Sequence, residues 1–449
     1  MFRIAGQTKE KEKTSLEIMN FAQRLIPQGR EDLETPIRAG YFTRGGRLKL
    51  PITLGLMVNL VRPGERVGYQ ELIDRFYSDT GLAEADKPRG YDRPPDQAAF
   101  CRARGKLPRE VFQEIFGNAV EDAQERAEGL GTCRWKGLRP KAVDGVRMNL
   151  PWSPDLEKAF GVPEGAHYPQ MLVCTLFDVL AKIPENVVWG PYCASERAML
   201  ELLYENLEPG DLLLADRGFP SFELLCEPKT RGFELLVRLP HNGLFGDVQA
   251  FLEAGHTDGE VLIRPPEELV RERRKAGEPA PEPVTLRIVK LEFSNGKSAV
   301  FATTLMDREK FPATEIGELY HLRWEEEEFF KLVKELLGGE NYRGQSQLFI
   351  EQELLSILLY CLMTRILMME CAAKHSMQLS SISQKHAFLS VSRYMDLMLT
   401  AKTERQYQIL VNRCVDEIAW RRYKKRPGRS YPRRSKSSFG KWGRKSEAA

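Results

Sequence analysis

The period of the hydrophobic pattern changes near residue 139, and this change limits the fold of the chain more than any other feature. Before it, segments such as 69–77 and 108–127 place apolar residues at helical spacing. After it come short apolar runs that predict strands, with one helix expected at 195–207. The runs lie at 141–143, 171–180, 187–189 and 211–215. This order of strand, strand, strand, helix and strand predicts a mixed α/β domain.

A length of 449 residues exceeds what one hydrophobic core normally holds, so we expect several domains. Further strands are expected at 233–239, 286–293 and 298–305, an Asn-Gly turn at 295–296 and a Pro-rich exposed loop at 264–283. The predicted domains are a helical N-terminal domain (1–135), an α/β domain in two parts (136–230 and 306–373), a β-rich insertion between them (231–305), and a helical C-terminal region with a basic tail (374–449).

Basic residues gather at the C-terminal end of the chain. The formal net charge is +3, but residues 421–449 hold twelve Lys or Arg and a single acid, Glu447. The other 420 residues carry 54 basic and 62 acidic groups. A basic segment on an acidic body favours a polyanionic partner such as DNA, because each bound phosphate releases counterions. A disordered, solubilising tail is the alternative.

The cysteines and the apolar runs bear on where the protein works. Eight cysteines without a Cys-x-x-Cys pair indicate free thiols in a reducing cytoplasm. The longest apolar run, 354–364, ends at Arg365 and is too short to span a membrane. The first residues do not resemble a signal peptide. We therefore expect a cytoplasmic protein without a membrane partner.

One charged segment, expected within a helix at 314–337, is the most informative part of the sequence. At about 100° per residue, five side chains lie within an arc of roughly 80°: Tyr320, Arg323, Glu327, Lys331 and Lys334. Apolar side chains occupy the opposite side and predict burial. The displayed face thus combines one carboxylate, three cations and a phenol. A solvated face with Glu–Lys pairs is the alternative.

Four consecutive acids, Glu325 to Glu328, lie in this segment. On the helix, Glu326 and Glu328 diverge from Glu327 by about 100° in opposite directions. We expect them to be too far from Glu327 to share a site with it. Glu325 turns toward the apolar side, which requires a crevice or a basic partner there.

Two aspartates follow apolar strands. Asp144 stands in Val-Asp-Gly, and Asp216 ends the run Leu-Leu-Leu-Ala-Asp. Carboxylates at strand ends project toward a crevice at the sheet edge, and together with Glu327 they can hold two hard cations. Taken alone, an Asp-Gly pair more often marks a turn. The side chains of Arg147, Glu196 and Arg217 lie beside these acidic blocks and could support them, or they could form surface or structural ion pairs.

The spacing Tyr-x2-Arg-x3-Glu-x6-Lys at Tyr320, Arg323, Glu327 and Lys334, in register with both aspartate blocks, resembles the bacterial insertion-sequence DDE transposases of the YREK type, the family founded on insertion sequence four. The resemblance covers most of the chain. It implies an RNase H-like core, a mixed sheet flanked by helices, interrupted by the β-rich insertion. The implied catalytic and metal-binding residues are Asp144, Asp216 and Glu327.

Further implications of the resemblance concern cofactors and partners. They are two Mg²⁺ or Mn²⁺ ions, double-stranded DNA at transposon-end inverted repeats and in the target, and a homodimer that performs cut-and-paste transposition on bacterial DNA. Arg323, Lys331 and Lys334 are implied to hold phosphates, and Tyr320 to pack against the DNA. This chain departs from its relatives at Glu326, where they usually carry an apolar residue, and lacks a tryptophan in the insertion.

Segment 96–106 is a candidate DNA-contacting helix through Arg102 and Arg104, with a solvated helix face as the alternative. Two alternative functions stay open at this stage. One is a metal-dependent DNA nuclease or resolvase on the same fold that does not transpose. The other is an inactive relative that only binds DNA.

Overall fold

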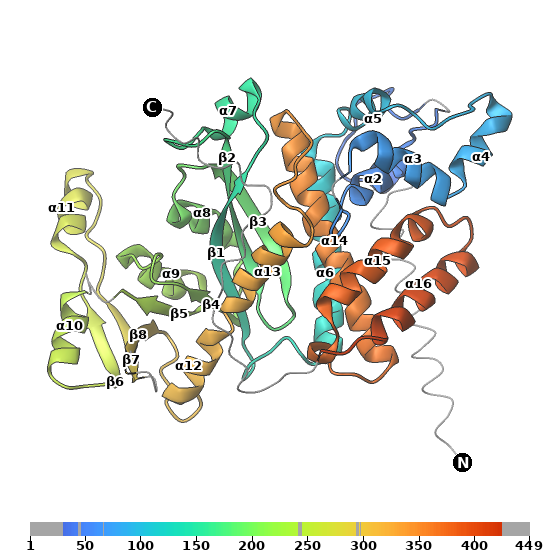
Figure 1. Ribbon diagram of the computed structural model, residues 1–449. Coiled ribbons are helices and arrows are strands. Elements are labelled where there is room, and N and C mark those ends of the chain that lie inside the picture. The colour runs from blue at the N-terminus through green and yellow to red at the C-terminus, as the bar shows by residue number, and fades with distance from the viewer. Residues whose placement is uncertain are drawn as a thin grey trace, which may run out of the picture.

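The computed structural model describes residues 30–43, 46–65, 67–240, 245–292, 296 and 298–423. Its strands form one eight-stranded sheet with the order β3-β2-β1-β4-β5-β8-β7-β6 (Figure 1). The strands are β1 (Arg139–Asn149), β2 (Gln170–Asp178), β3 (Ile183–Pro191), β4 (Asp211–Ala215), β5 (Glu234–Leu239), β6 (Asp258–Ile263), β7 (Val284–Glu292) and β8 (Ser298–Thr303).

The first five strands have the order and directions of an RNase H-like core. β1 pairs antiparallel with β2, and β2 pairs antiparallel with β3, whereas β4 and β5 continue the sheet parallel to β1. The expected mixed α/β class is therefore confirmed. The remaining strands extend the same sheet, because β8 pairs antiparallel with β5 and is followed by β7 and β6.

The insertion holds more regular structure than the sequence pattern suggested. Helices α10 (Gly246–Glu253) and α11 (Glu267–Lys275) lie in it, and β6 lies between them. The prediction of an exposed loop over 264–283 is therefore wrong for the residues of α11. None of the α11 residues is buried, so the helix leaves no apolar stripe for a sequence pattern to reveal. The expected hairpin is present, with β7 and β8 paired and Gly296 in the left-handed region at φ 73°.

Two hydrophobic clusters cover the two faces of the sheet, because side chains along a strand alternate between faces. On β1, Ala142 belongs to one cluster and Val143 to the other. The Ala142 cluster includes helix α13 and the long helix α14, and the Val143 cluster includes α8 and α9. The helices are α7 (Pro154–Phe160), α8 (Glu196–Leu203), α9 (Phe222–Arg231), α12 (Ala313–His321), α13 (Trp324–Glu335) and α14 (Gln347–Lys374).

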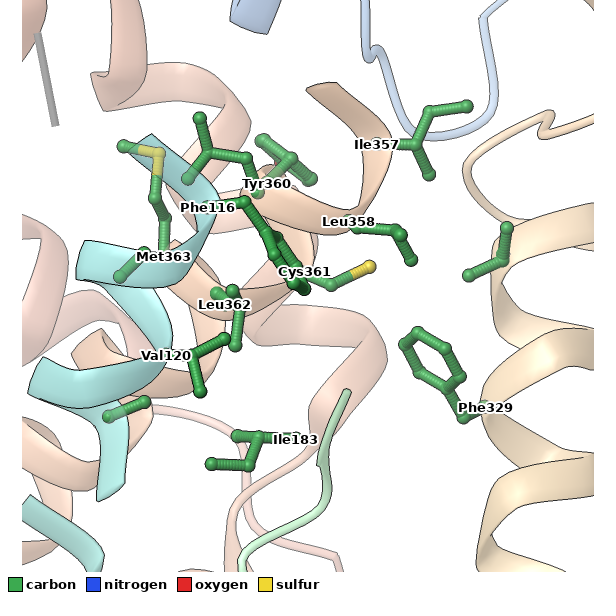
Figure 2. Packing of buried hydrophobic residues seen from close by; sticks show 14 of the residues in the cluster. Phe116, Val120, Ile183, Phe329, Ile357, Leu358, Tyr360, Cys361, Leu362 and Met363 are labelled. Atoms are coloured by element: carbon green, nitrogen blue, oxygen red, sulfur yellow. The ribbon is translucent and has the colours of Figure 1, made fainter. Parts of the chain in front are cut away.

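Helix α14 is the centre of the larger cluster. Its length and composition would suit a membrane span, but 94% of its most apolar window is buried inside the protein. Figure 2 shows Leu358, Cys361 and Leu362 of this helix among Phe116 and Val120 of α6 (Arg109–Gly129), with Phe329 of α13 on another side. An apolar helix covered on all sides is a core helix.

The N-terminal and C-terminal helices pack around α14 and share its core (Figure 1). They are α2 (Leu50–Asn59), α3 (Tyr69–Asp79), α4 (Leu82–Asp86), α5 (Gln97–Arg104), α6 (Arg109–Gly129), α15 (Gln384–Leu399) and α16 (Glu404–Ala419). Helices α3, α5 and α6 occupy segments predicted to be helical. The domain boundaries drawn from the sequence stay a prediction, and most of the basic tail lies outside the described residues. All eight cysteines are free.

Candidate active site

Strands β1 and β4 bring the two predicted aspartates to equivalent positions. These strands are parallel neighbours, and the last residue pair of their ladder is Val143 with Ala215. Asp144 is the next residue of β1, and Asp216 directly follows β4. The expectation that Asp144 ends its strand is wrong, because β1 stays paired with β2 as far as Asn149. By the alternation of side chains, Asp144 continues the face that Ala142 occupies, which α13 covers.

Helix α13 supplies the third carboxylate. It packs against β1 through an apolar side that includes Phe329, Phe330 and Val333. Glu327 lies on its solvent side, with 44% of its side chain exposed. Both Glu327 and Asp216 are close enough to Asp144 to raise the pKa of that carboxyl. The three predicted acids thus occupy one region of the molecule, although they are 183 positions apart in sequence from first to last.

Arg323 connects two of these acids. Its Nη2 donates a hydrogen bond to Oε1 of Glu327 at 2.6 Å, and its Nη1 lies 3.5 Å from Oδ2 of Asp144. Only 7% of the side chain is exposed. Burial by itself would lower the pKa of Arg323, but Tyr320, Glu327 and Asp144 together raise it above the usual value. The guanidinium is a permanent positive charge placed between two carboxylates.

The two aspartates are held by the backbone that follows each of them. Oδ1 of Asp144 accepts a hydrogen bond from Gly145 N–H at 2.9 Å, and Oδ1 of Asp216 accepts one from Gly218 N–H at 2.6 Å. Burial raises the pKa of Asp144 to about 6, and Arg323 and the Gly145 N–H act against that rise. The carboxylate of Asp144 is therefore a group whose negative charge is under-compensated in the free protein.

The segment around Arg323 is two helices instead of the single helix that we predicted. Helix α12 ends at His321 and α13 begins at Trp324. Tyr320 consequently leaves the displayed face, and its ring packs against Phe301 with centroids 4.8 Å apart. Only 8% of Tyr320 is exposed. The structure does not support direct DNA contact by this tyrosine, because its ring is buried. The guanidinium carbon of Arg323 lies 5.9 Å from the centroid of that ring.

The four consecutive acids have four different environments. Glu325 forms an ion pair with Lys182 at 2.7 Å, which supplies the basic partner that its position required. Glu328 is exposed, with Lys331 at 3.8 Å. Glu326 is fully buried and accepts hydrogen bonds from the Thr175 hydroxyl and the Asp144 backbone N–H.

The exclusion of Glu326 from a metal site shared with Glu327 stays a prediction, although Glu326 lies closer to Asp144 than the helix wheel could show. The helix wheel placed it correctly away from the solvent face of Glu327, but that direction leads to the backbone of Asp144. Burial raises the pKa of Glu326 well above the usual value, and the charge of Asp144 adds to the rise. Sequence reasoning noticed Glu326 only as a departure from its relatives and did not place it beside Asp144.

The predicted basic residues divide into three groups. Lys331 and Arg102 are exposed and available to DNA. Lys334 donates a hydrogen bond to the Arg147 carbonyl at 2.6 Å and so ties α13 to β1. Arg104 is fully buried and bonds to Gln352 and Glu353 of α14 at 3.0 and 2.9 Å. The predicted DNA contact of Arg104 is wrong, because no part of its side chain reaches the surface.

The residues of the site fit a hard divalent cation by chemistry. The candidate ligands are all carboxylates, the oxygen donors that Mg²⁺ and Mn²⁺ prefer. Within the described part of the chain, no three side chains of His, Cys, Asp or Glu meet closely enough to hold an ion. Arg323 lies between Asp144 and Glu327, so its positive charge offsets part of the negative charge of these two acids.

Comparison with known proteins places this site in a family. Residues 135–363, which include all three acids, match the family model described as a transposase DDE domain. Because this span is just over half of the 449 residues, the chain belongs to that family. Members of the family use divalent metal ions.

Individual relatives agree with this placement. The chain is 25% identical to the transposase InsG for insertion sequence element IS4 of Escherichia coli strain K12, over 61% of this chain and 62% of the relative. It is also 25% identical to the putative transposase InsZ of the same organism, over 30% of this chain and 46% of the relative. Less than two thirds of each of these relatives is covered. The resemblance to the family founded on insertion sequence four is confirmed.

The synaptic complex of piggyBac transposase with hairpin DNA aligns with 92% of this chain and 84% of its own, at a TM-score of 0.44 and 11% identity.

Proposed function

We propose that this protein is a transposase that cuts DNA at the inverted repeats of its element and joins the ends to new DNA. The observation that carries the proposal is the placement of Asp144 within β1 and of Asp216 directly after the parallel neighbour β4, at equivalent positions and beside the helix that bears Glu327. Membership of the DDE family supports the same conclusion. Three carboxylates beside a phosphate-binding cation suit phosphoryl transfer and serve no purpose in a protein that only binds DNA.

Asp144, Asp216 and Glu327 are proposed to hold two Mg²⁺ or Mn²⁺ ions. Bound there, the ions would activate a water or a 3′-hydroxyl and stabilise the leaving oxygen of an in-line displacement at phosphorus. The protein itself contributes orientation. Glu326, which accepts a hydrogen bond from the Thr175 hydroxyl, holds the backbone of Asp144. The Gly145 N–H donates a hydrogen bond to the Asp144 carboxylate and so orients it.

Arg323 and Lys331 are proposed to bind the DNA phosphates beside the scissile bond. Each lies one helical turn from Glu327. Arg323 is buried and contacts Glu327, whereas Lys331 is exposed. Guanidinium groups bind phosphate oxygens with two N–H donors, so Arg323 can exchange a carboxylate partner for a phosphate. We further propose a cytoplasmic homodimer, since a mobile element has two ends and each chain provides one set of three acids.

The direct test uses purified protein, Mg²⁺ and a linear DNA that carries the element's own ends. We expect cleavage at both ends and their transfer into a supercoiled plasmid. Asp144→Asn should abolish both reactions while binding of the ends persists. Cleavage without transfer would favour a nuclease or resolvase, and specific binding without cleavage would favour an inactive relative.

A separate prediction concerns the basic tail, most of which lies outside the described residues. Deleting residues 421–449 should make DNA binding weaker at low salt and less dependent on salt. Each lost phosphate contact should change the slope of log affinity against log salt by about 0.9. Fluorescence anisotropy at several salt concentrations measures this slope. An unchanged slope would show that the tail does not contact DNA.

A further inference from the structure

A fourth carboxylate, that of Glu196, lies at the candidate metal site. Glu196 is the first residue of α8 and is half-buried. A Cβ placed on Gly145 would come within 2.8 Å of its Cγ, Cδ and Oε1 atoms. The carboxylate therefore lies directly on the backbone of the residue that follows Asp144. Among the described residues, no hydrogen bond or ion pair joins Glu196 to a partner. Asp144 and Glu327, in contrast, both contact Arg323.

We propose that Glu196 is an additional metal ligand of this site, acting with Asp144 and Asp216. The inference rests on the proposed function, because it concerns the same divalent ions. It assigns to this chain a set of four acids, Asp144, Asp216, Glu327 and Glu196, in place of the three that the family motif contains.

The topology explains how Glu196 reaches the site. Asp144 faces the α13 side of the sheet, so Gly145 faces the opposite side, where α8 packs. Strand β4 ends at Ala215, so from Asp144 onward β1 has no hydrogen-bonded neighbour on the β4 side. Glu196 and Glu327 approach this unpaired edge of β1 from the two faces of the sheet. Both carboxylates can therefore reach an ion bound beside Asp144 and Asp216.

Glu196 also lies near a second carboxylate, that of Asp216, and near the guanidinium of Arg147. Arg147 Nε donates its hydrogen bond to the Tyr192 carbonyl. Two neighbouring carboxylates repel each other, and a divalent ion bound between them would remove the repulsion.

Gly145 supports the same conclusion. It lies within β1, opposite Cys174 of β2, where glycine is a weak strand former. Its backbone is not in the left-handed region, so conformation does not require glycine there. A Cβ at this position would instead require the Glu196 carboxylate to move away, so glycine allows that carboxylate to keep its place. An acid in the first turn of a helix is also favoured by the helix dipole, but that effect needs no glycine on a neighbouring strand.

The test measures metal binding without relying on catalysis. Full-length protein is titrated with Mn²⁺, and free Mn²⁺ is followed by electron paramagnetic resonance. Glu196→Gln should bind Mn²⁺ at least about tenfold more weakly, since even groups that only support metal ligands change affinity by this factor. The matched control is Glu201→Gln, an exposed acid on the same helix, which should bind like the wild type. Thermal unfolding without metal should show that both variants are folded.

The outcomes separate this inference from the proposed function. If Asp144→Asn loses Mn²⁺ and Glu196→Gln binds like the wild type, Glu196 is not a ligand and the proposed function stands. If the wild type binds no Mn²⁺ and cleaves no DNA, both are wrong.

A double-mutant cycle tests the contact between Glu196 and Gly145. Gly145→Ala should weaken Mn²⁺ binding in the wild type by displacing the Glu196 carboxylate. In a Glu196→Ala background the added methyl group has room, so the same substitution should have little further effect. Independent, additive effects of the two substitutions would contradict the proposal.

Discussion

Glu327→Gln is expected to reduce DNA cleavage by at least about 10³-fold, because losing several kcal/mol of charge stabilisation costs tenfold for each 1.4 kcal/mol. The substitution keeps the size of the side chain and its hydrogen bond with Arg323, so the fold and the binding of DNA ends should persist. It removes the negative charge that an ion requires. Cleavage of an end-bearing DNA, measured together with its binding, checks the prediction.

The matched control is Glu328→Gln, the next residue on the same helix. Glu328 is exposed and its only described ionic neighbour is Lys331 at 3.8 Å, so this variant should keep nearly full activity. Glu326 is unsuitable as a second control, because its carboxyl group contacts the backbone of Asp144. Equal loss of activity in the Glu327 and Glu328 variants would show that the assignment of the third acid is wrong.

Arg104→Met should lower the free energy of unfolding by about 3–5 kcal/mol, the usual effect of breaking a buried ion pair. The guanidinium of Arg104 is fully buried and joins α5 to α14 through Gln352, Glu353 and the Phe349 carbonyl. Methionine has a similar length but leaves the carboxylate of Glu353 without its cation. Urea unfolding followed by circular dichroism measures the change.

Arg102→Met provides the comparison, since Arg102 lies two residues earlier on the same helix and is exposed. It should change the free energy of unfolding by less than about 0.5 kcal/mol, as is usual for surface substitutions. Its effect should appear in DNA binding instead. A stable Arg104→Met variant with weaker DNA binding would restore the sequence-based prediction that Arg104 contacts DNA.

The local pattern of the chain was sufficient to find the three acids of the site. Asp144 and Asp216 each follow a short apolar run, and this pattern can be recognised without knowledge of the neighbouring strands. Glu327 was recognised from its spacing to Arg323 and Lys334 along a helix. These features depend on the period of a strand or a helix, which is set by neighbouring residues.

Contacts between distant segments were not predictable in this way. The helix wheel gave the direction of Glu326 but could not show that Asp144 and Thr175 lie in that direction. Arg104 was interpreted as a surface residue because α14, which buries it, comes 243 residues later. Helix α11 has no buried residue, so its sequence carries too few apolar residues to predict a helix.

The sequence by itself therefore determined the fold class and the family and indicated the three candidate acids, since each is expressed in short-range spacing. Only the tertiary structure decided which charged side chains are buried and which meet each other. Three contacts depend on how β1 and β4 lie in the sheet. Arg323 lies between Asp144 and Glu327, Glu326 lies against the backbone of Asp144, and Glu196 lies against Gly145. Burial and charge pairing are set by residues from distant segments, which the local period of the chain does not specify.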